Sequence, residues 1–271
     1  MSYASIMLHV SSEAAAQPRL ACAHDLAARF DATLIGVGAE MTPPIADSGY
    51  GFADNWYVLM ADEIDRRLKA AESQFREAAK DLARPAVWEC GLRYPTGAVV
   101  LASRAADLIV ASRPQGGDIH RHADPAELAI ASGRPVFIPP STPRPLDLRR
   151  VLLAWKDTRE ARRAMSDALP LLQRAEAVRV LELCHGDEAD DARIRTNDVA
   201  AALRRHGVAA EADVSVRTAA SGHDVMAEAD AFDAGLIVAG AYGHSRLGEW
   251  VFGGMTRDLL AHGDRCVLLS H

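Results

Sequence analysis

The chain repeats itself, and this duplication limits most strongly how it can fold. Moving residues 6–10 along by 145 positions places their apolar run over residues 151–155. The segments ADLIVAS and AGLIVAG, which start at Ala106 and Ala234, match at a shift of 128. A third pair, GRPVFIP and DRCVLLS, matches at a shift of 131. Because the order of the segments is kept, the sequence indicates a tandem duplication.

The duplication also predicts the domain boundaries. At 271 residues the chain is long enough for two separate cores. We expect a first domain over residues 1–140, a linker over 141–149 and a second domain over 150–271. The linker lies in PPSTPRPLD, where four prolines in nine residues favour extended backbone. The difference between the shifts of 145 and 128 places about 17 extra residues in the first domain, as a loop and then a long helix over about 58–82.

Each half alternates short apolar runs with helical stretches. In the second half we expect strands near residues 150–155, 177–183, 210–216, 234–239 and 265–269, and helices near 158–173, 192–206, 222–231 and 250–262. The runs VLLAW, GLIVAG and CVLLS are continuous, as in parallel strands that are buried on both faces. This pattern predicts an α/β fold with two tandem, doubly wound, five-stranded parallel-sheet domains of the Rossmann-like type. Ligands bind such sheets beyond the carboxyl ends of the strands, so the loops after the first and fourth strands are the places to inspect.

The composition excludes several classes of protein. Hydrophobic residues make up 49% and charged residues 25%, which is typical of a soluble globular chain. With 30 basic and 37 acidic residues the net charge is −7, so we expect no nucleic-acid partner. The sequence contains no uncharged run of ~18 apolar residues, so we expect no membrane span. The first residues lack the basic and apolar regions of a signal peptide, and we therefore expect a cytoplasmic protein.

The four cysteines lie far apart and form no CxxC pair; they are Cys22, Cys90, Cys184 and Cys266. Each stands in an apolar or strand-like stretch. We expect reduced thiols that pack as small hydrophobic groups.

One motif carries chemistry, in the segment GAYGHSRLGEWVFGGMTRDLL that begins at Gly240. Two residues separate Gly240 from Gly243, and nine more precede Gly253 and Gly254. Glycines let the backbone approach a ligand closely, and the free N–H groups of a helix N-terminus suit a phosphate. By themselves, scattered glycines more often serve a turn. The order of strand, glycines and helix favours a binding role here.

With this motif, the five-strand repeat and the VLLAW strand, the chain resembles the universal stress protein family in its tandem form. The resemblance covers nearly the whole chain. It implies an internal pseudo-dimer with antiparallel contact between residues 136–138 and 267–269, and leaves a homodimer open. It also implies a non-catalytic protein that acts in the stress response through a ligand or partner. In ATP-binding members the glycine motif holds the phosphates, with Ser or Thr after its third glycine, and a carboxylate ending the first strand holds the adenine end.

The chain departs from that pattern in both halves. Gly254 stands where the hydroxyl residue is expected, and Thr256 lies two residues later. Lys156 occupies the acidic position, and Ser11 stands at the matching place in the first half. Residues 111–127 lack the matching glycines. We therefore expect no usual ATP site in the first half and a weak or non-standard one in the second.

The candidate nucleotide site thus lies in the second half, with ATP or AMP as its ligand. Its predicted residues are Gly240, Gly243, His244, Ser245, Gly253, Gly254, Thr256, Ala154 and Trp155.

Catalysis finds little support in the sequence, which contains no GxxxxGK[ST], GxGxxG or GxSxG motif. An acid/base pair that assembles from Asp157, His185 or His244 stays open. A metal-dependent enzyme is the weakest hypothesis, and we expect no metal. Its candidate ligands would be Asp118, His120, His122 and Asp124, which alternate without the spacing typical of zinc sites.

Overall fold

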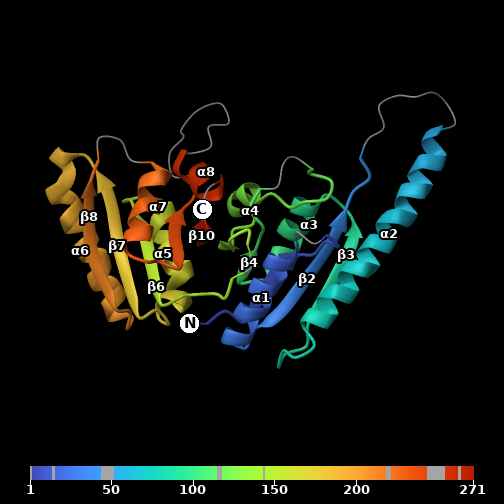
Figure 1. Cartoon of the computed structure of the whole chain (residues 1–271), viewed down its shortest axis with the longest axis horizontal. Helices are drawn as coiled ribbons and strands as arrows, with labels where there is room; N and C mark the ends of the chain where they lie inside the picture. Colours follow the sequence, from blue (N-terminus) through green and yellow to red (C-terminus); the bar gives the residue numbers. More distant parts are fainter. Residues whose placement is uncertain are drawn as a thin grey trace. The chain divides into compact units, whose positions relative to one another are not determined.

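The computed structural model describes residues 2–13, 16–43, 52–114, 118–142, 144–217, 221–242, 254–261 and 264–271, without the side chains of residues 52–55 and 57. The chain divides into two compact units, which we call the first unit (Tyr3–Ser132) and the second unit (Gly133–His271). In both units strands alternate with helices along the chain (Figure 1). The α/β class predicted from the duplication is therefore confirmed.

The first unit contains a parallel sheet with the strand order β3-β2-β1-β4. Its elements are β1 (Ser5–His9), α1 (Gln17–Phe30), β2 (Thr33–Glu40), α2 (Phe52–Ala78), β3 (Val87–Leu92), α3 (Pro95–Ala102), a 3₁₀ turn (Ser103–Ala105), β4 (Leu108–Val110) and α4 (Pro125–Ala131). Helix α1 packs beside α2, and α3 beside α4. Right-handed crossovers place these two pairs on opposite faces of the sheet.

Helix α2 differs from its predicted span of about 58–82. It starts at Phe52, because nothing after Gly51 in the sequence breaks a helix, and it ends at Ala78. Beyond Ala78 the backbone bonds tighten from four residues to three, with Leu82 N–H donating to Ala79, and the helix stops.

One apolar face of α2 packs into the core, with Ile64, Ala71 and Phe75 buried. Phe75 is fully buried and packs against Trp88 with ring centroids 5.4 Å apart. A Cβ at Gly36 or Gly38 would come within 2.8 and 2.5 Å of the Trp88 ring, so the two glycines of β2 make room for these rings. This packing holds α2 on the sheet.

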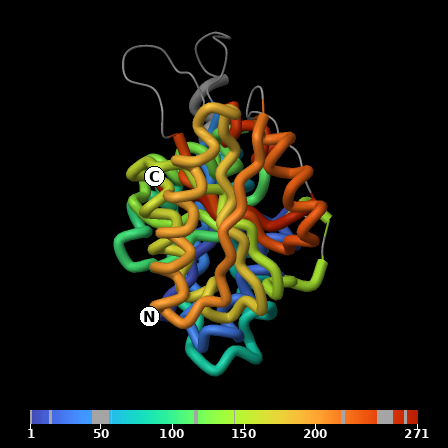
Figure 2. The backbone as a smooth tube through the Cα atoms, turned by 90° about the vertical axis from the view of Figure 1, so that its left-hand side faces the viewer, coloured from blue at the N-terminus to red at the C-terminus, as the bar shows by residue number. Residues whose placement is uncertain are grey.

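The second unit contains six strands in the order β5-β10-β9-β6-β7-β8. Its elements are β5 (Val136–Ile138), β6 (Arg150–Trp155), α5 (Arg159–Leu172), β7 (Ala177–Cys184), a 3₁₀ turn (Gly186–Glu188), α6 (Ala189–Arg205), β8 (Ala210–Val216), α7 (Gly222–Ala231), β9 (Leu236–Gly240), α8 (Gly254–Ala261) and β10 (Cys266–Ser270). Figure 2 shows α6 and α7 on opposite sides of the edge strand β8. The sheet is thus covered on both faces.

Strand β5 pairs antiparallel with β10, and every other strand pair of this unit is parallel. Val136 faces Leu269, and Ile138 faces Val267. The predicted contact between residues 136–138 and 267–269 is therefore confirmed. The fifth strand of the first repeat lies in the second unit, because this pairing joins it to the last strand of the chain.

The reversal of strand order fixes where each unit can hold a ligand. In the first unit the order reverses between β1 and β4, and in the second between β6 and β9. These are the ends of the first and fourth strands of each repeat, as the sequence predicts. At such a reversal the two crossovers leave in opposite directions, which opens a crevice at the carboxyl edge.

The described structure joins none of the four thiols in a disulfide, and the thiols are not equally packed. Cys184 and Cys266 are buried as expected, and Cys22 is half-buried. The expectation of a packed thiol is wrong for Cys90, which is exposed. It lies on the edge strand β3, which pairs on one side only with a described strand.

Candidate functional site

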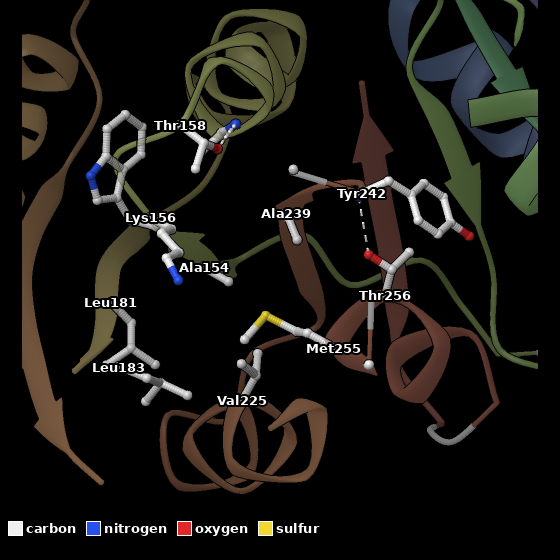
Figure 3. A pocket seen from close by; sticks show the side chains of 14 residues that line it. Ala154, Lys156, Thr158, Leu181, Leu183, Val225, Ala239, Tyr242, Met255 and Thr256 are labelled. Atoms are coloured by element: carbon white, nitrogen blue, oxygen red, sulfur yellow. Dashed lines mark hydrogen bonds between the residues drawn. The ribbon is translucent and has the colours of Figure 1, made fainter. Parts of the chain in front are cut away.

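A cavity of about 250 Å³ lies at the carboxyl edge of the second unit, beside the reversal between β6 and β9 (Figure 3). Its walls come from three strands (β6, β7 and β9) and three helices (α5, α7 and α8). Five residues of the predicted nucleotide site line it: Ala154, Trp155, Gly240, Gly254 and Thr256. The fold thus brings together segments that lie about 100 residues apart in the sequence.

Small side chains make the floor of the cavity. The strand register aligns Leu181, Ala154 and Ala239 in one row across β7, β6 and β9. Residues in one row of a parallel sheet point to the same face. Because two of the three are alanines, the space above the end of the sheet stays open.

Gly240 lets helix α5 approach the end of β9. A Cβ at this position would lie 2.6 Å from the Ala161 backbone nitrogen and 2.7 Å from the Glu160 carbonyl carbon. Real Cβ atoms do not come so close to backbone atoms, so any other residue would displace the first turn of α5. The predicted glycine therefore has a packing role, and it lines the cavity as well.

Thr256 is buried and ties α8 to the chain that leaves β9. Its Oγ1 accepts a hydrogen bond from the Tyr242 backbone N–H at 3.4 Å. Tyr242 has φ of 59°, in the left-handed region that turns the chain sharply after the strand. Figure 3 shows its ring pointing away from the cavity. The Thr256 hydroxyl is thus already engaged, although a hydroxyl keeps a donor for a ligand.

Lys156 is the only charged side chain among the described residues that line the cavity. It follows β6 directly, is exposed, and extends into the cavity in Figure 3. The neighbouring Asp157 does not line the cavity and pairs instead with Arg162. The charge of the described wall is therefore positive, which favours a ligand with an anionic group.

The apolar wall is the part of the site that the sequence analysis missed. Leu181 and Leu183 come from β7, Val225 from α7 and Met255 from α8. The two leucines are two positions apart and so lie on the same face of β7, a relation that can be read from the sequence once the strand is predicted. Val225 and Met255 have no such signal, because only the packing of α7 against α8 brings them together.

At the matching edge of the first unit, larger side chains stand at the aligned positions. The shift of 145 aligns His9 with Ala154, and Arg19 with Ala164 of α5, while the shift of 128 aligns Ser112 with Gly240. His9 and Arg19 are 2% and 4% exposed. We call His9, Arg19 and Ser112 the basic cluster. The basic cluster thus has a histidine, an arginine and a serine where the second unit has two alanines and a glycine.

Comparisons with known proteins find likeness in structure and not in sequence. No family model and no curated protein matches the chain. A universal stress protein from Archaeoglobus fulgidus DSM 4304 matches with a TM-score of 0.68 at 14% identity, over 98% of this chain and 95% of that one. The chain has the tandem universal stress protein fold.

Two further solved structures match along the whole chain. A protein described as a universal stress protein from Pseudomonas aeruginosa UCBPP-PA14 has a TM-score of 0.58 at 16% identity, over 99% of this chain and 93% of that one. A functionally unknown protein from Pseudomonas aeruginosa PAO1 matches with a TM-score of 0.59 at 14% identity, over 99% of this chain and 92% of that one. The resemblance read from the glycine motif and the repeat therefore agrees with the fold of the full chain.

On this universal stress protein fold, part of the predicted site lies outside the described residues. These positions are Gly243, His244, Ser245 and Gly253. The acid/base candidates among the described residues do not meet at the cavity: His185 is exposed and, like Asp157, is absent from the walls.

The histidine and aspartate run of the first unit has other partners. Asp124 caps α4 by accepting from the N–H groups of Ala126 and Glu127, and Asp118 accepts from the His120 N–H. His122 Nε2 lies 3.5 Å from Glu13. Within the described residues, no three metal-ligating side chains gather at one place.

No helix in the described parts of the chain combines the length and the apolar character that crossing a membrane requires.

Proposed function

We propose that the chain is a non-catalytic, cytoplasmic universal stress protein that acts by binding a small ligand in the cavity of the second unit. The observation that carries this proposal is the cavity itself, at the strand reversal where this class of sheet binds ligands. Its walls are mostly apolar, with Lys156 as a single cation. Such a lining suits a compact ligand with an apolar body and an anionic end.

The lining also supports a binding role over catalysis. Among the described wall residues there is no histidine, cysteine, aspartate or glutamate. Histidine and carboxylate side chains are the residues that most often act as the general base in acid/base catalysis or activate a hydroxyl nucleophile. Besides Tyr242, the described wall has two hydroxyl residues, Thr158 and Thr256, and each accepts a hydrogen bond from a backbone N–H, of Ala161 and Tyr242 respectively. Neither has a base within the described wall.

An adenine nucleotide is the second candidate, because five residues of the predicted nucleotide site line the cavity. A base would lie against Leu181 and Met255, and its phosphates would meet Lys156 and the start of α8 at Gly254. Lys156 cannot accept a hydrogen bond from the adenine or ribose end, as a carboxylate would. We therefore expect weak binding and slow or no hydrolysis.

Calorimetric titration of the full chain with ATP, AMP and cyclic AMP tests the second candidate. The matched variants are Met255→Trp, which fills the cavity, and Met255→Leu, which keeps its volume. We expect Met255→Trp to lower nucleotide affinity at least tenfold and Met255→Leu to leave it unchanged. No heat at millimolar nucleotide would contradict the nucleotide candidate alone.

The broader proposal has its own test. A panel of small organic acids and metabolites is scanned for a rise in the melting temperature of the full chain and of Met255→Trp. Ligands of the cavity raise it in the full chain and not in the variant. A panel in which every stabilising compound acts equally on both proteins would overturn the cavity as the functional site.

A further inference from the structure

Arg19 is the most deeply buried cation of the first unit, and two of its three guanidinium nitrogens have no partner among the described residues. It lies in the first turn of α1 and is 4% exposed. Its Nη1 donates to Ser112 Oγ at 2.6 Å, which directs the side chain to the carboxyl edge beside β4. Its Nε and Nη2 are buried and have no hydrogen-bond partner in the described part of the chain. A buried polar group without a partner is costly.

Two other arginines of this protein show how the same pair of atoms is normally used. Nε and Nη2 of Arg67 donate to the two oxygens of Glu40, at 3.1 and 2.6 Å. Nε and Nη2 of Arg195 donate to the carboxylate of Glu182, the shortest contact being 2.6 Å. We call this pair of donor atoms, Nε and Nη2, the fork of the guanidinium. In both arginines the fork binds a carboxylate. Arg19 presents the same fork in a more buried place, and no described carboxylate occupies it.

The nearest acidic group does not fill this fork. Glu13 is close enough to oppose the fall in the Arg19 pKa, but its carboxylate pairs with Arg121 and lies 3.5 Å from His122. Burial lowers the pKa of Arg19 to about 10, so the guanidinium is charged at neutral pH. The positive charge therefore stays inside the unit without a counter-charge in contact.

The start of α1 adds to the positive potential. Its first turn holds no acidic residue, and the N-cap Ala16 provides no side-chain acceptor. The N-terminus of a helix carries about half a positive charge, so a cation in the first turn is unfavourable there and an anion is favoured. The helix N-terminus and the guanidinium therefore both favour an anionic partner.

His9 adds an unused acceptor to the basic cluster. Its Nε2 lies 2.9 Å from the Ala39 carbonyl oxygen, which can only accept, so Nε2 carries the hydrogen. The other ring nitrogen, Nδ1, is then an acceptor, and it is buried with no partner in the described residues. Burial and then the Arg19 charge lower the pKa of His9 to about 3, so the ring is neutral.

We propose that the first unit binds a small oxyanion, a phosphate or carboxylate group, on the Nε and Nη2 fork of Arg19 at the carboxyl edge beside β4. The fork matches the two oxygens of such a group, as Glu40 and Glu182 show. This site is separate from the cavity of the second unit and uses none of its residues.

Thermal unfolding of the full chain in sodium phosphate, sodium acetate and sodium chloride at equal ionic strength tests the proposal. We expect phosphate or acetate to raise the melting temperature by at least about 3 °C over chloride. Arg19→Met abolishes this rise, and the matched change Arg29→Met on the same helix, where Arg29 pairs with Asp25 at an exposed position, keeps it. Met255→Trp also keeps it, which separates this site from the cavity.

A second variant covers a failure of Arg19→Met to fold. Arg19→Lys keeps the charge and loses the fork, so titration calorimetry with inorganic phosphate or acetate should show at least a tenfold weaker affinity. A response to phosphate alone assigns a phosphate ligand, and a response to acetate assigns a carboxylate. Equal melting temperatures in the three salts, or an equal rise in Arg19→Met, would overturn the proposal.

Discussion

The carboxyl edges of the two units occupy matching places in a duplicated chain and are built in opposite ways. In the second unit Ala154 and Gly240 leave a cavity that is mostly apolar and carries one exposed lysine. In the first unit His9 and Ser112 stand at these places, and Arg19 reaches the edge from α1. Strands buried on both faces tolerate few residue types, whereas the edge beyond them tolerates many. A repeat can therefore keep its fold while its two edges acquire different chemistry.

The largest expected effect concerns Gly240. Gly240→Ala should lower the free energy of unfolding by about 3 kcal/mol, because its Cβ would overlap the backbone of α5. Urea denaturation measures this loss. The control Gly91→Ala has no atom within 4 Å of the added Cβ and should stay within about 0.5 kcal/mol of the wild type. Equal stability of the two variants would show that α5 does not need the glycine.

Ser112 tests whether the first edge depends on its buried cation. Ser112→Ala should cost about 2 kcal/mol, because it removes the hydrogen bond that the Arg19 guanidinium donates. In an Arg19→Met background the same change should cost close to nothing, and a double-mutant cycle from urea denaturation gives the coupling. A loss that is the same in both backgrounds would mean that Ser112 acts independently of Arg19.

His9 should make the first unit sensitive to acid, unlike the second unit, which has Ala154 there. The folded pKa of about 3 lies below the ordinary 6.5, so between these values only the unfolded chain takes up the proton. Stability from this group is complete above pH 6.5 and falls as the pH drops, by about 1.4 kcal/mol at pH 5.5. Urea denaturation at pH 7.5 and 5.5 measures the fall in the free energy of unfolding between these pH values. In His9→Leu the part of this fall that comes from His9 should be absent. It should persist in the exposed control His185→Gln.

The smallest expected effect separates the starts of the two matching helices. Thr158 caps α5 by accepting from the Ala161 N–H at 3.3 Å, whereas Ala16 at the start of α1 has no side-chain acceptor. Thr158→Ala should cost about 1 kcal/mol in urea denaturation, and Thr158→Ser should cost little. If both variants lost the same amount, the methyl group and not the cap would stabilise this turn.

Much of the fold could be predicted because its strands follow a simple rule. The runs over residues 150–155 and 210–216 match β6 and β8 to the residue. Strand β6 is almost continuously apolar, as parallel strands covered on both faces are, whereas the edge strand β8 alternates apolar and polar residues. Helix α7 matches its predicted span as well. The ends of α2 were less predictable, because a switch in hydrogen bonding and not a breaker residue ends this helix.

The site was predicted in part, for reasons that can be traced to residues. Ala154, Gly240 and Thr256 belong to segments with a recognisable repeat or glycine pattern, and they line the cavity. Val225 and Met255 also line it, but they look like ordinary helix residues. Nothing in the sequence marks two first-turn side chains from different helices as neighbours.

The sequence by itself determined the duplication and the α/β class, because these depend on local apolar patterns that repeat in order. The pairing of residues 136–138 with 267–269 was implied by the family resemblance, and the structure confirms it. Only the tertiary structure decided what each carboxyl edge contains. It left space above Ala154 in one unit, and in the other it buried Arg19 with two guanidinium nitrogens that have no hydrogen-bond partner among the described residues. The physical reason is that burial and hydrogen bonding depend on which distant segments come into contact, and such contacts produce no periodic pattern in the sequence.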